Sequence, residues 1–337
     1  MEYEIELKLL TNEQAGELIN TKLLPQINAK VTQELLVLTN HYFDTPDRVL
    51  RKHDIGLRIR GNDQKFEQTL KTAGKSIGGL HQRPEYNVQL NEINKQTIVV
   101  PELKLFPVSA WPNNLDVDLL QTKIETLFTT HFTRQVFLFE LANHDTVELV
   151  WDHGEIIANN RRTPICEVEL ELKKGKVASL FDLARQIVKI LPTTIGKDSK
   201  AARGYHLLDE TPFKEPISYQ AVMPNNSQLS SNILVSMLDK ALQDYQIYSM
   251  AIKNQYLPNV AHDVLLIITD LSEIVAKLHR IYNEHLLGIS YSSLLDFAHE
   301  YSQLEKYNDR KALCDLLAHP KITEWQLNLV QYLAEQV

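Results

Sequence analysis

The chain has 337 residues, of which 44% are hydrophobic and 23% charged, a length that corresponds to roughly two domains. This balance excludes a disordered chain and a collagen-like repeat, and two cysteines exclude a disulfide scaffold. A net charge of −8 argues against broad nucleic-acid binding, which needs a basic surface to neutralise phosphates. The longest apolar run, Val264 to Ile268, is far shorter than the ~20 residues that span a bilayer, and the acidic first residues do not resemble a signal peptide. We therefore expect a cytoplasmic protein that binds neither nucleic acid nor membrane.

Residues up to about 208 predict a β-rich domain, because short runs of Val, Ile, Phe and Tyr alternate with charged residues between turn formers. The expected strands are 2–10, 34–43, 55–61, 64–72, 82–90, 133–142, 145–151, 154–159 and 165–173. Two helices interrupt them. The first follows a capping box at Thr11 to Gln14, and the second is capped by Ser179 and stopped by Pro192.

After Pro212 and Pro216 the pattern becomes helical. Residues 223–229 resemble a linker, and beyond them apolar residues recur at spacings of three and four, which places them on helix faces. From Thr211 to the end, this part carries a net charge of −5, from 9 basic and 14 acidic residues. We expect two domains, 1–210 and 225–337, the second of them all-helical.

Charged residues alternate with apolar ones on several predicted strands. Glu4, Glu6 and Lys8 occupy every second position, so on a strand they point to one face while Ile5 and Leu7 point to the other. The same alternation recurs at Arg58/Arg60, Glu67/Thr69/Lys71, Arg83/Glu85 and Glu167/Glu169/Glu171. One such strand has most simply a solvated outer face, whereas several together are compatible with a closed antiparallel barrel with a charged interior.

The residue types in these faces indicate a chemistry. Clustered carboxylates suit a hard divalent ion such as Mg²⁺ or Mn²⁺, and several Arg and Lys side chains facing them suit a polyanion, because guanidinium forks match phosphate oxygens. A metal and cations around a phosphate chain are the components of phosphoryl transfer. The alternation by itself does not establish that the barrel closes.

The order of these motifs resembles that of CYTH domains, the triphosphate tunnel metalloenzymes. Glu4-Ile5-Glu6-Leu7-Lys8 resembles the ExExK signature of that family. Eight further segments resemble later motifs in the same order: Tyr42-Phe43-Asp44-Thr45-Pro46, Leu57-Arg58-Ile59-Arg60, Thr69-Leu70-Lys71, Arg83-Pro84-Glu85-Tyr86, Phe132-Thr133-Arg134, the "DxG" turn at Trp151-Asp152-His153-Gly154, the strand from Cys166 to Leu172, and the closing segment from Ser199 to Tyr205. The resemblance covers about 1–208.

The resemblance implies an α+β fold: an eight-stranded antiparallel β-barrel tunnel with flanking helices, followed by the all-α domain. It also implies roles for individual residues. The metal, Mg²⁺ or Mn²⁺ with one or two ions, would be held by Glu4, Glu6, Asp152, Glu169 and Glu171. The phosphates would be bound by Lys8, Arg58, Arg60, Lys71, Arg83, Arg134 and Lys200. Lys8, Glu169 and Glu171 would be the catalytic residues, Glu85 would orient neighbouring cations, and Glu167 shares the parity of Glu169 but is expected to lie beyond the site.

The helical domain resembles a reduced CHAD module, which often follows a CYTH domain. It departs from that module's pattern, because Asp263 to Asp270 is apolar and acidic where repeated arginines are expected. We consider dimerisation or shielding of the tunnel mouth as its roles.

The leading functional hypothesis is an inorganic triphosphatase that cuts tripolyphosphate into pyrophosphate and phosphate. The alternatives are another triphosphate enzyme (thiamine triphosphatase, nucleoside triphosphatase or class IV adenylate cyclase) and a non-catalytic polyphosphate-binding protein. The four carboxylates Glu4, Glu6, Glu169 and Glu171 count against the last, because anion binding alone gains nothing from them.

Overall fold

The computed structural model describes residues 2–61, 66–90, 100–209, 216–221, 229–254, 257–282, 289 and 291–336. The chain divides into two compact units. The first comprises Met1–Ser76, Leu80–Leu180 and Gly196–Pro212, and the second comprises Ile77–Gly79, Phe181–Ile195 and Phe213–Val337. No helix in these ranges is both long enough and apolar enough to cross a membrane.

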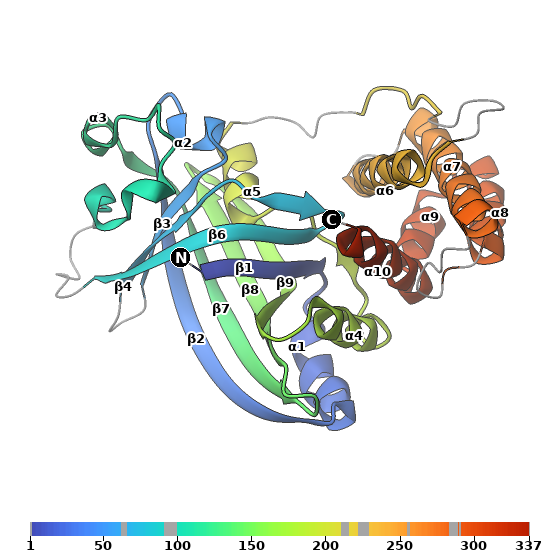
Figure 1. Cartoon of the computed structure of the whole chain (residues 1–337), viewed down its shortest axis with the longest axis horizontal. Helices are drawn as coiled ribbons and strands as arrows, with labels where there is room; N and C mark the ends of the chain where they lie inside the picture. Colours follow the sequence, from blue (N-terminus) through green and yellow to red (C-terminus); the bar gives the residue numbers. More distant parts are fainter. Residues whose placement is uncertain are drawn as a thin grey trace. The chain divides into compact units, whose positions relative to one another are not determined.

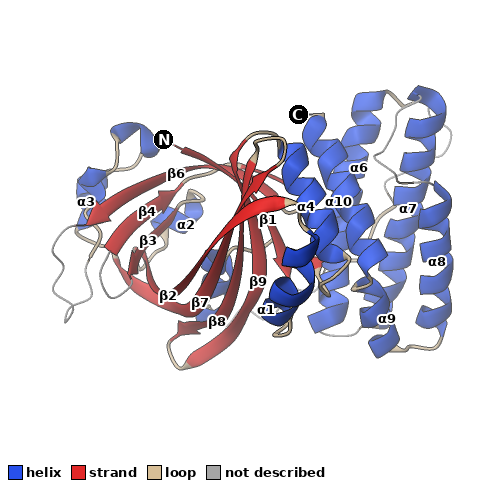
Figure 2. Cartoon of the chain, turned by 90° about the horizontal axis from the view of Figure 1, so that it is seen from below, coloured by secondary structure: helices blue, strands red, loops and turns tan. Residues whose placement is uncertain are grey.

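The first unit is built on a closed antiparallel barrel, shown in Figures 1 and 2. Its eight strands are β1 (Glu2–Leu10), β2 (Ala29–Asp44), β3 (Gly56–Gly61), β4 (Phe66–Lys71), β6 (Leu80–Leu90), β7 (Glu125–Leu141), β8 (Thr146–Ala158) and β9 (Arg161–Lys174). They follow one another around the barrel in the order β1-β9-β8-β7-β2-β3-β4-β6, and β6 pairs with β1 to close the ring. β5 (Lys75–Ile77) and β10 (Thr194–Ile195) are two further short strands. The predicted barrel and the predicted C-terminal helices are both confirmed.

One predicted turn is wrong. Residues 145–151 and 154–159, predicted as two strands around a turn at Asp152 to Gly154, form the single strand β8. Gly154 pairs with Phe132 of β7, and a Cβ built on it would lie 2.2 Å from the carbonyl oxygen of His131. Glycine at 154 therefore permits a close approach between two strands, which is an alternative to a turn for a glycine in a strand pattern.

Short helices and turns connect the strands of the first unit. They are α1 (Ala15–Leu18), which continues as the π-helix η1 (Ile19–Leu23), η2 (Leu24–Gln26), α2 (Val49–Lys52), η3 (Leu103–Leu105), η4 (Val108–Ala110), α3 (Val117–Gln121) and α5 (Lys200–Leu208). The predicted capping box is not formed, because the helix begins after Gln14, whose backbone N–H donates to Asn12 Oδ1. Ser179 lies inside α4 (Val177–Val188) and not at its N-cap, and its hydroxyl donates to Asp145.

Two apolar clusters hold the first unit together. In one, the segment carrying η3, η4 and α3 packs on β2, β3, β4 and β6, with Phe43, Leu57, Leu103 and Trp111 among its buried members. In the other, Tyr205 of α5 packs with Phe128 and Phe132 of β7. Since Phe132 has the same strand parity as Arg134, α5 covers apolar residues that continue the inner face of the barrel. This fixes the start of α5, at Lys200, beside the charged interior.

The second unit is helical. Its long helices are α6 (Ser231–Asn254), α7 (Pro258–Tyr282), α8 (Tyr291–Lys306), α9 (Arg310–Leu317) and α10 (Pro320–Glu335), and it includes the second half of α4. Arg185 of α4 donates to Asn328 and Gln331 of α10, and the carbonyl of Gly78 accepts from Gln246 of α6. Three separate stretches of chain therefore make up this unit.

Candidate functional site

The charged face of the barrel strands lines a cavity of about 210 Å³ inside the first unit. The sequence-predicted residues that line it are Glu4, Glu6, Lys8, Arg58, Arg60, Lys71, Arg83, Glu85, Arg134, Glu169, Glu171 and Lys200. They come from β1, β3, β4, β6, β7, β9 and α5. Asp152 and Glu167 are fully buried behind this lining, in direct contact with it. The alternation of charged and apolar positions thus brings together residues that lie up to about 200 positions apart.

Two lysines lie at the most buried part of the cavity. Lys8 Nζ lies 2.9 Å from Glu167 Oε1 and also contacts Glu169, and Lys200 Nζ lies 2.5 Å from Glu167 Oε1 and 2.9 Å from Glu169 Oε1. Burial alone would lower the pKa of both lysines, but the surrounding carboxylates outweigh it and raise both above the ordinary value. Both ammonium groups are therefore held charged and in place.

Arg134 also donates hydrogen bonds to the buried carboxylates, namely to Asp152 and Glu169. Its Nε and Nη2 each donate to Asp152 at 2.7 Å in a forked pair, and Nη2 also donates to Glu169 at 2.9 Å. Burial would raise the pKa of Asp152, but Arg134 and Lys200 hold it below its usual range. A bidentate fork of this kind is among the stronger and more directional side-chain pairs.

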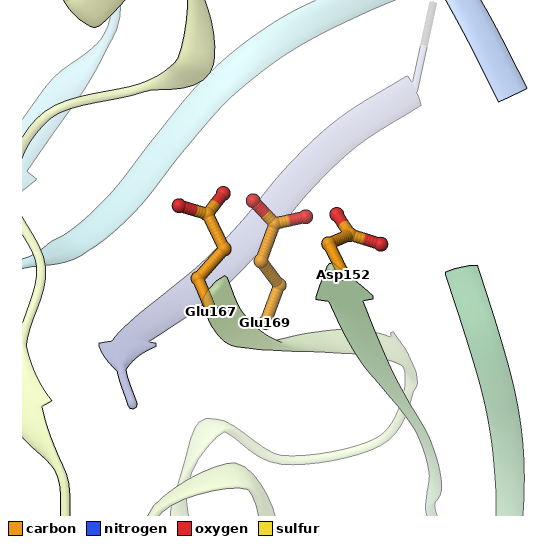
Figure 3. A group of neighbouring side chains, drawn as sticks. All are labelled: Asp152, Glu167 and Glu169. Atoms are coloured by element: carbon orange, nitrogen blue, oxygen red, sulfur yellow. The ribbon is translucent and has the colours of Figure 1, made fainter. Parts of the chain in front are cut away.

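Asp152, Glu167 and Glu169 form a compact acidic group, drawn in Figure 3. One oxygen from each lies within 4.8 Å of the others, so the group could hold a metal ion. Four cationic side chains contact it, namely Lys8, Arg134, Lys200 and Arg203, the last donating to Glu167 at 2.9 Å. Since these cations already neutralise three carboxylates, a metal would have to compete with them.

A second group of carboxylates faces the open part of the cavity. Glu4 accepts from Lys71 at 2.5 Å and from Arg83 at 2.9 Å, and these cations lower its pKa against the effect of burial. Glu6 and Glu171 are opposite one another on β1 and β9. Burial, followed by the charge of Glu169, raises the pKa of Glu6 to about 7, and Lys8, 3.7 Å away, offsets this only in part. Burial likewise raises the pKa of Glu171.

These oxygen donors fit a hard divalent ion. Glu6 and Glu171 are carboxylates whose ionised form is under-compensated by the cations around them, and Glu4 and Glu169 lie beside them. Carboxylate oxygens are the ligands that Mg²⁺ and Mn²⁺ prefer, and a bound cation would supply the missing positive charge. Glu6 and Glu171, which face the cavity, thus fit the ion better than Asp152 and Glu167, which are buried behind the lining and neutralised by cations.

The opposite wall of the cavity has an excess of positive charge. Arg58 and Arg60 project from β3, where the Arg58 side chain has one weak ion pair, at 3.8 Å to Glu85. Arg58 Nε is buried and has no hydrogen-bond partner among the residues that the structure describes, and Arg60 Nε donates to the amide oxygen of Asn40 at 2.9 Å. Burial, then the neighbouring Arg58 and Arg134, lowers the pKa of Arg60 to about 9. This wall has positive charge that an anionic ligand would neutralise.

Sequence reasoning missed part of the lining. Tyr42, Asn87, Glu148 and Lys173 also face the cavity. Glu148 could have been found, because it lies four positions before Asp152 on the same strand face. Glu167, expected beyond the site, is fully buried and holds both Lys8 and Lys200. No sequence pattern indicates this role, because it depends on strand register and on where α5 begins.

Comparison with known proteins agrees with this arrangement. Residues 2–205 match the family model of the CYTH domain, which is more than half of the chain. The chain belongs to the CYTH family. The resemblance seen in the nine motifs is therefore confirmed.

Among curated CYTH relatives, the inorganic triphosphatase of Haemophilus influenzae is 40% identical over 208 residues. The match spans 60% of this chain and 54% of that protein, so it covers about half of the relative's length.

Solved structures similar to the CYTH chain include one from Hippeastrum, studied as an adenylyl cyclase and described as having a dominant triphosphatase activity. It has a TM-score of 0.40 and 20% identity, and covers 60% of this chain and 95% of that one. The Mimivirus capping enzyme triphosphatase has a TM-score of 0.33 and 12% identity, over 56% of this chain and 89% of that one.

Proposed function

We propose that this chain hydrolyses inorganic triphosphate to pyrophosphate and phosphate inside the barrel, with the help of Mg²⁺ or Mn²⁺. The observation that carries the proposal is the paired imbalance of charge across one cavity. Arg58 and Arg60 form a wall with excess positive charge, and Glu6 and Glu171 form a wall with under-compensated negative charge. A polyphosphate and a divalent cation, bound together, would neutralise both walls. The curated relative named an inorganic triphosphatase supports the same substrate.

The cations of the cavity bind and orient the phosphate chain. Arg58 and Arg60 bind it from β3, and Lys71 and Arg83 bind it from the β4–β6 side, each able to exchange a carboxylate contact for a phosphate contact. Asp152 and Glu169 fix the side chains of Arg134 and Lys200 in place. The remaining N–H donors of these two side chains are therefore rigidly positioned to bind phosphate oxygens. Positioned cations of this kind stabilise charge on a transferring phosphoryl group.

Lys8 faces the terminal phosphate and orients the attacking water. Glu167 and Glu169 hold the ammonium group of Lys8, a residue that is only 2% exposed. The ammonium group therefore does not need to reorganise during the reaction. Glu4, Glu6, Glu169 and Glu171 would hold the metal, and Asp152 would support them through Arg134. When bound, the metal supplies neutralisation of developing charge and acidification of a coordinated water.

The activity belongs to the barrel, residues 1–210 in our division of the chain, and 225–337 form a separate, divergent CHAD-like helical domain. The two compact units differ from this division in that Ile77–Gly79 and Phe181–Ile195 belong to the helical unit. We propose that the helical domain supports a homodimer, and that the protein acts in the cytoplasm on a small polyanion without nucleic-acid or membrane partners.

The deciding experiment is phosphate release from tripolyphosphate, ATP and thiamine triphosphate in Mg²⁺ or Mn²⁺. We expect metal-dependent turnover that is fastest with tripolyphosphate, and its loss in Glu169→Gln. Arg162→Gln is the matched control, since Arg162 is an exposed residue outside the cavity. Faster turnover of ATP or thiamine triphosphate would show that the preferred substrate is that compound and not tripolyphosphate. Tight, metal-independent binding of tripolyphosphate without release would identify a binding protein.

A further inference from the structure

Lys173 lies beside the cavity-facing carboxylates and has no role in the reaction just described. Glu148 of β8 and Glu171 of β9 are directly opposite in the strand register. Lys173 is two residues beyond Glu171, at a bulge where Leu172 and Lys174 pair with the neighbours Val147 and Thr146. Its side chain lines the cavity together with those of Glu148 and Glu171. The geometry therefore places one ammonium group over a pair of carboxylates.

The contacts of Lys173 are unequal. Its Nζ lies 2.8 Å from Glu171 Oε1 and 3.5 Å from Glu148 Oε1. The principal partner is thus Glu171, a carboxylate that we assign to the metal. Glu148 is a second partner within a short movement of the lysine side chain.

This pair is much easier to break than the ion pairs at the buried end. The Lys173 side chain is 34% exposed and that of Glu171 23%, against 3% for Lys8 and 0% for its partner Glu167. A partly solvated ammonium group that leaves its partner is hydrated, whereas one at the buried end would be left without water. Lys173 is consequently displaceable, and Lys8 is not.

We propose that Lys173 is a resident counter-ion of Glu171, which a divalent cation displaces onto Glu148 when it binds. Lys173 is then a positioning residue that sets the metal affinity of the cavity, because an ammonium group and a metal ion compete for the same carboxylate oxygens. The inference rests on the proposed function in one respect, the assignment of Glu171 to the metal. It adds a lysine and a carboxylate that the family resemblance does not include.

The test is a titration of the full-length protein with Mn²⁺ in the absence of substrate, followed by electron paramagnetic resonance of the free ion. We expect Lys173→Met to bind Mn²⁺ roughly twofold to fivefold more tightly than the wild type, the size expected when a partly exposed ion pair no longer has to be broken. Lys174→Met is the matched control, because Lys174 is the exposed neighbour outside the cavity lining and the same charge is removed. Lys173→Arg, which keeps the charge, should not tighten binding.

A second variant tests the destination of the lysine. Glu148→Gln removes its alternative partner, so the ammonium group stays on Glu171 and Mn²⁺ should bind more weakly than in the wild type. Equal Mn²⁺ affinity in Lys173→Met and Lys174→Met would overturn the proposal, and so would the absence of Mn²⁺ binding in both. Tripolyphosphate turnover is measured separately. A Mn²⁺ affinity that changes in Lys173→Met, in a protein without turnover, contradicts the proposed function only. Turnover with an unchanged Mn²⁺ affinity in Lys173→Met contradicts only the proposal that Lys173 is a counter-ion.

Discussion

The phenol of Tyr205 donates a 2.7 Å hydrogen bond to the carboxylate of Asp44, 161 residues earlier in the chain. Asp44 is fully buried, and its oxygens also accept from the backbone N–H groups of Thr45, Leu50 and Arg51. Asp44 thus organises the end of β2 and the start of α2 and anchors α5 to them. Since α5 begins at Lys200, this bond fixes a residue of the cavity from a distance.

We predict that Tyr205→Phe lowers both stability and turnover. The variant leaves a buried carboxylate with one donor fewer, which costs about 1–2 kcal/mol. It also loosens the helix that carries Lys200, so tripolyphosphate turnover should fall severalfold. Thermal unfolding and phosphate release measure the two effects, with Tyr307→Phe as the control because that tyrosine is 81% exposed. Unchanged values in both assays would show that the bond does not anchor α5.

Arg58→Met is predicted to stabilise the protein while weakening its substrate binding. Removing this side chain eliminates a buried Nε without a partner and a like charge beside Arg60, which together should raise the free energy of unfolding by about 1 kcal/mol. The loss of a charge-assisted phosphate contact should raise the KM for tripolyphosphate about tenfold or more. Denaturant titration and steady-state kinetics check the two signs. Arg162→Met, at a site with 64% side-chain exposure, should change neither. A less stable Arg58→Met would contradict the imbalance of charge on this wall.

Gly154→Ala should destabilise the barrel without touching the cavity lining. The added Cβ would lie 2.2 Å from the carbonyl oxygen of His131 and 2.5 Å from the Cα of Phe132, both backbone atoms of β7. Forcing two paired strands apart costs about 2–3 kcal/mol. Gly56→Ala provides the comparison, because among the described residues, its two chain neighbours apart, none has an atom within 4 Å of the Cβ position there. Equal melting temperatures for the two variants would show that β7 and β8 separate more easily than their packing indicates.

We predict that the buried side chain of Lys253 makes the stability of the helical unit depend on pH. Burial lowers its pKa to about 8 from the ordinary value of 10.5, so the folded chain releases this proton at a lower pH than the unfolded chain does. Between about pH 8 and 10.5 the unfolded chain therefore binds more protons, and stability rises with pH in that window. Below about pH 8, the buried charge of Lys253 lowers the free energy of unfolding by at most about 3 kcal/mol.

Lys253→Met should accordingly be more stable than the wild type at pH 7, with an advantage that shrinks towards pH 10. Thermal unfolding at pH 7 and at pH 9.5 measures both values. The exposed Lys311 supplies the control variant Lys311→Met. An advantage that is equal at the two pH values would mean that methionine merely packs better and that the charge is not involved.

The sequence predicted which side chains face the interior better than it predicted what they contact. Parity along a strand assigns Glu4, Glu6 and Lys8 to one face, and nothing beyond local alternation is needed for that. That Lys8 contacts Glu167 depends on the register between β1 and β9, which are about 160 residues apart, and on the position of α5. Asp44 shows a different limit, since it belongs to a segment that identified the family, yet its role is to anchor Tyr205. Gly154 was predicted to lie in a turn because Trp151 to Gly154 resembles the "DxG" turn of the family, whereas the close packing of β7 against β8 determines its place in a strand.

The position of α4 in the chain has a consequence during synthesis. Its second half contains Phe181, Leu183, Ile187 and Val188, all at most 1% exposed, and its Arg185 bonds to Asn328 and Gln331, 143 and 146 residues later. At the ribosome's rate of about 5–20 residues per second, those partners emerge roughly seven to thirty seconds after α4 does. For that interval Arg185 of α4 is on the nascent chain without the two α10 side chains that complete its hydrogen bonds, and this is the period in which a chaperone would bind.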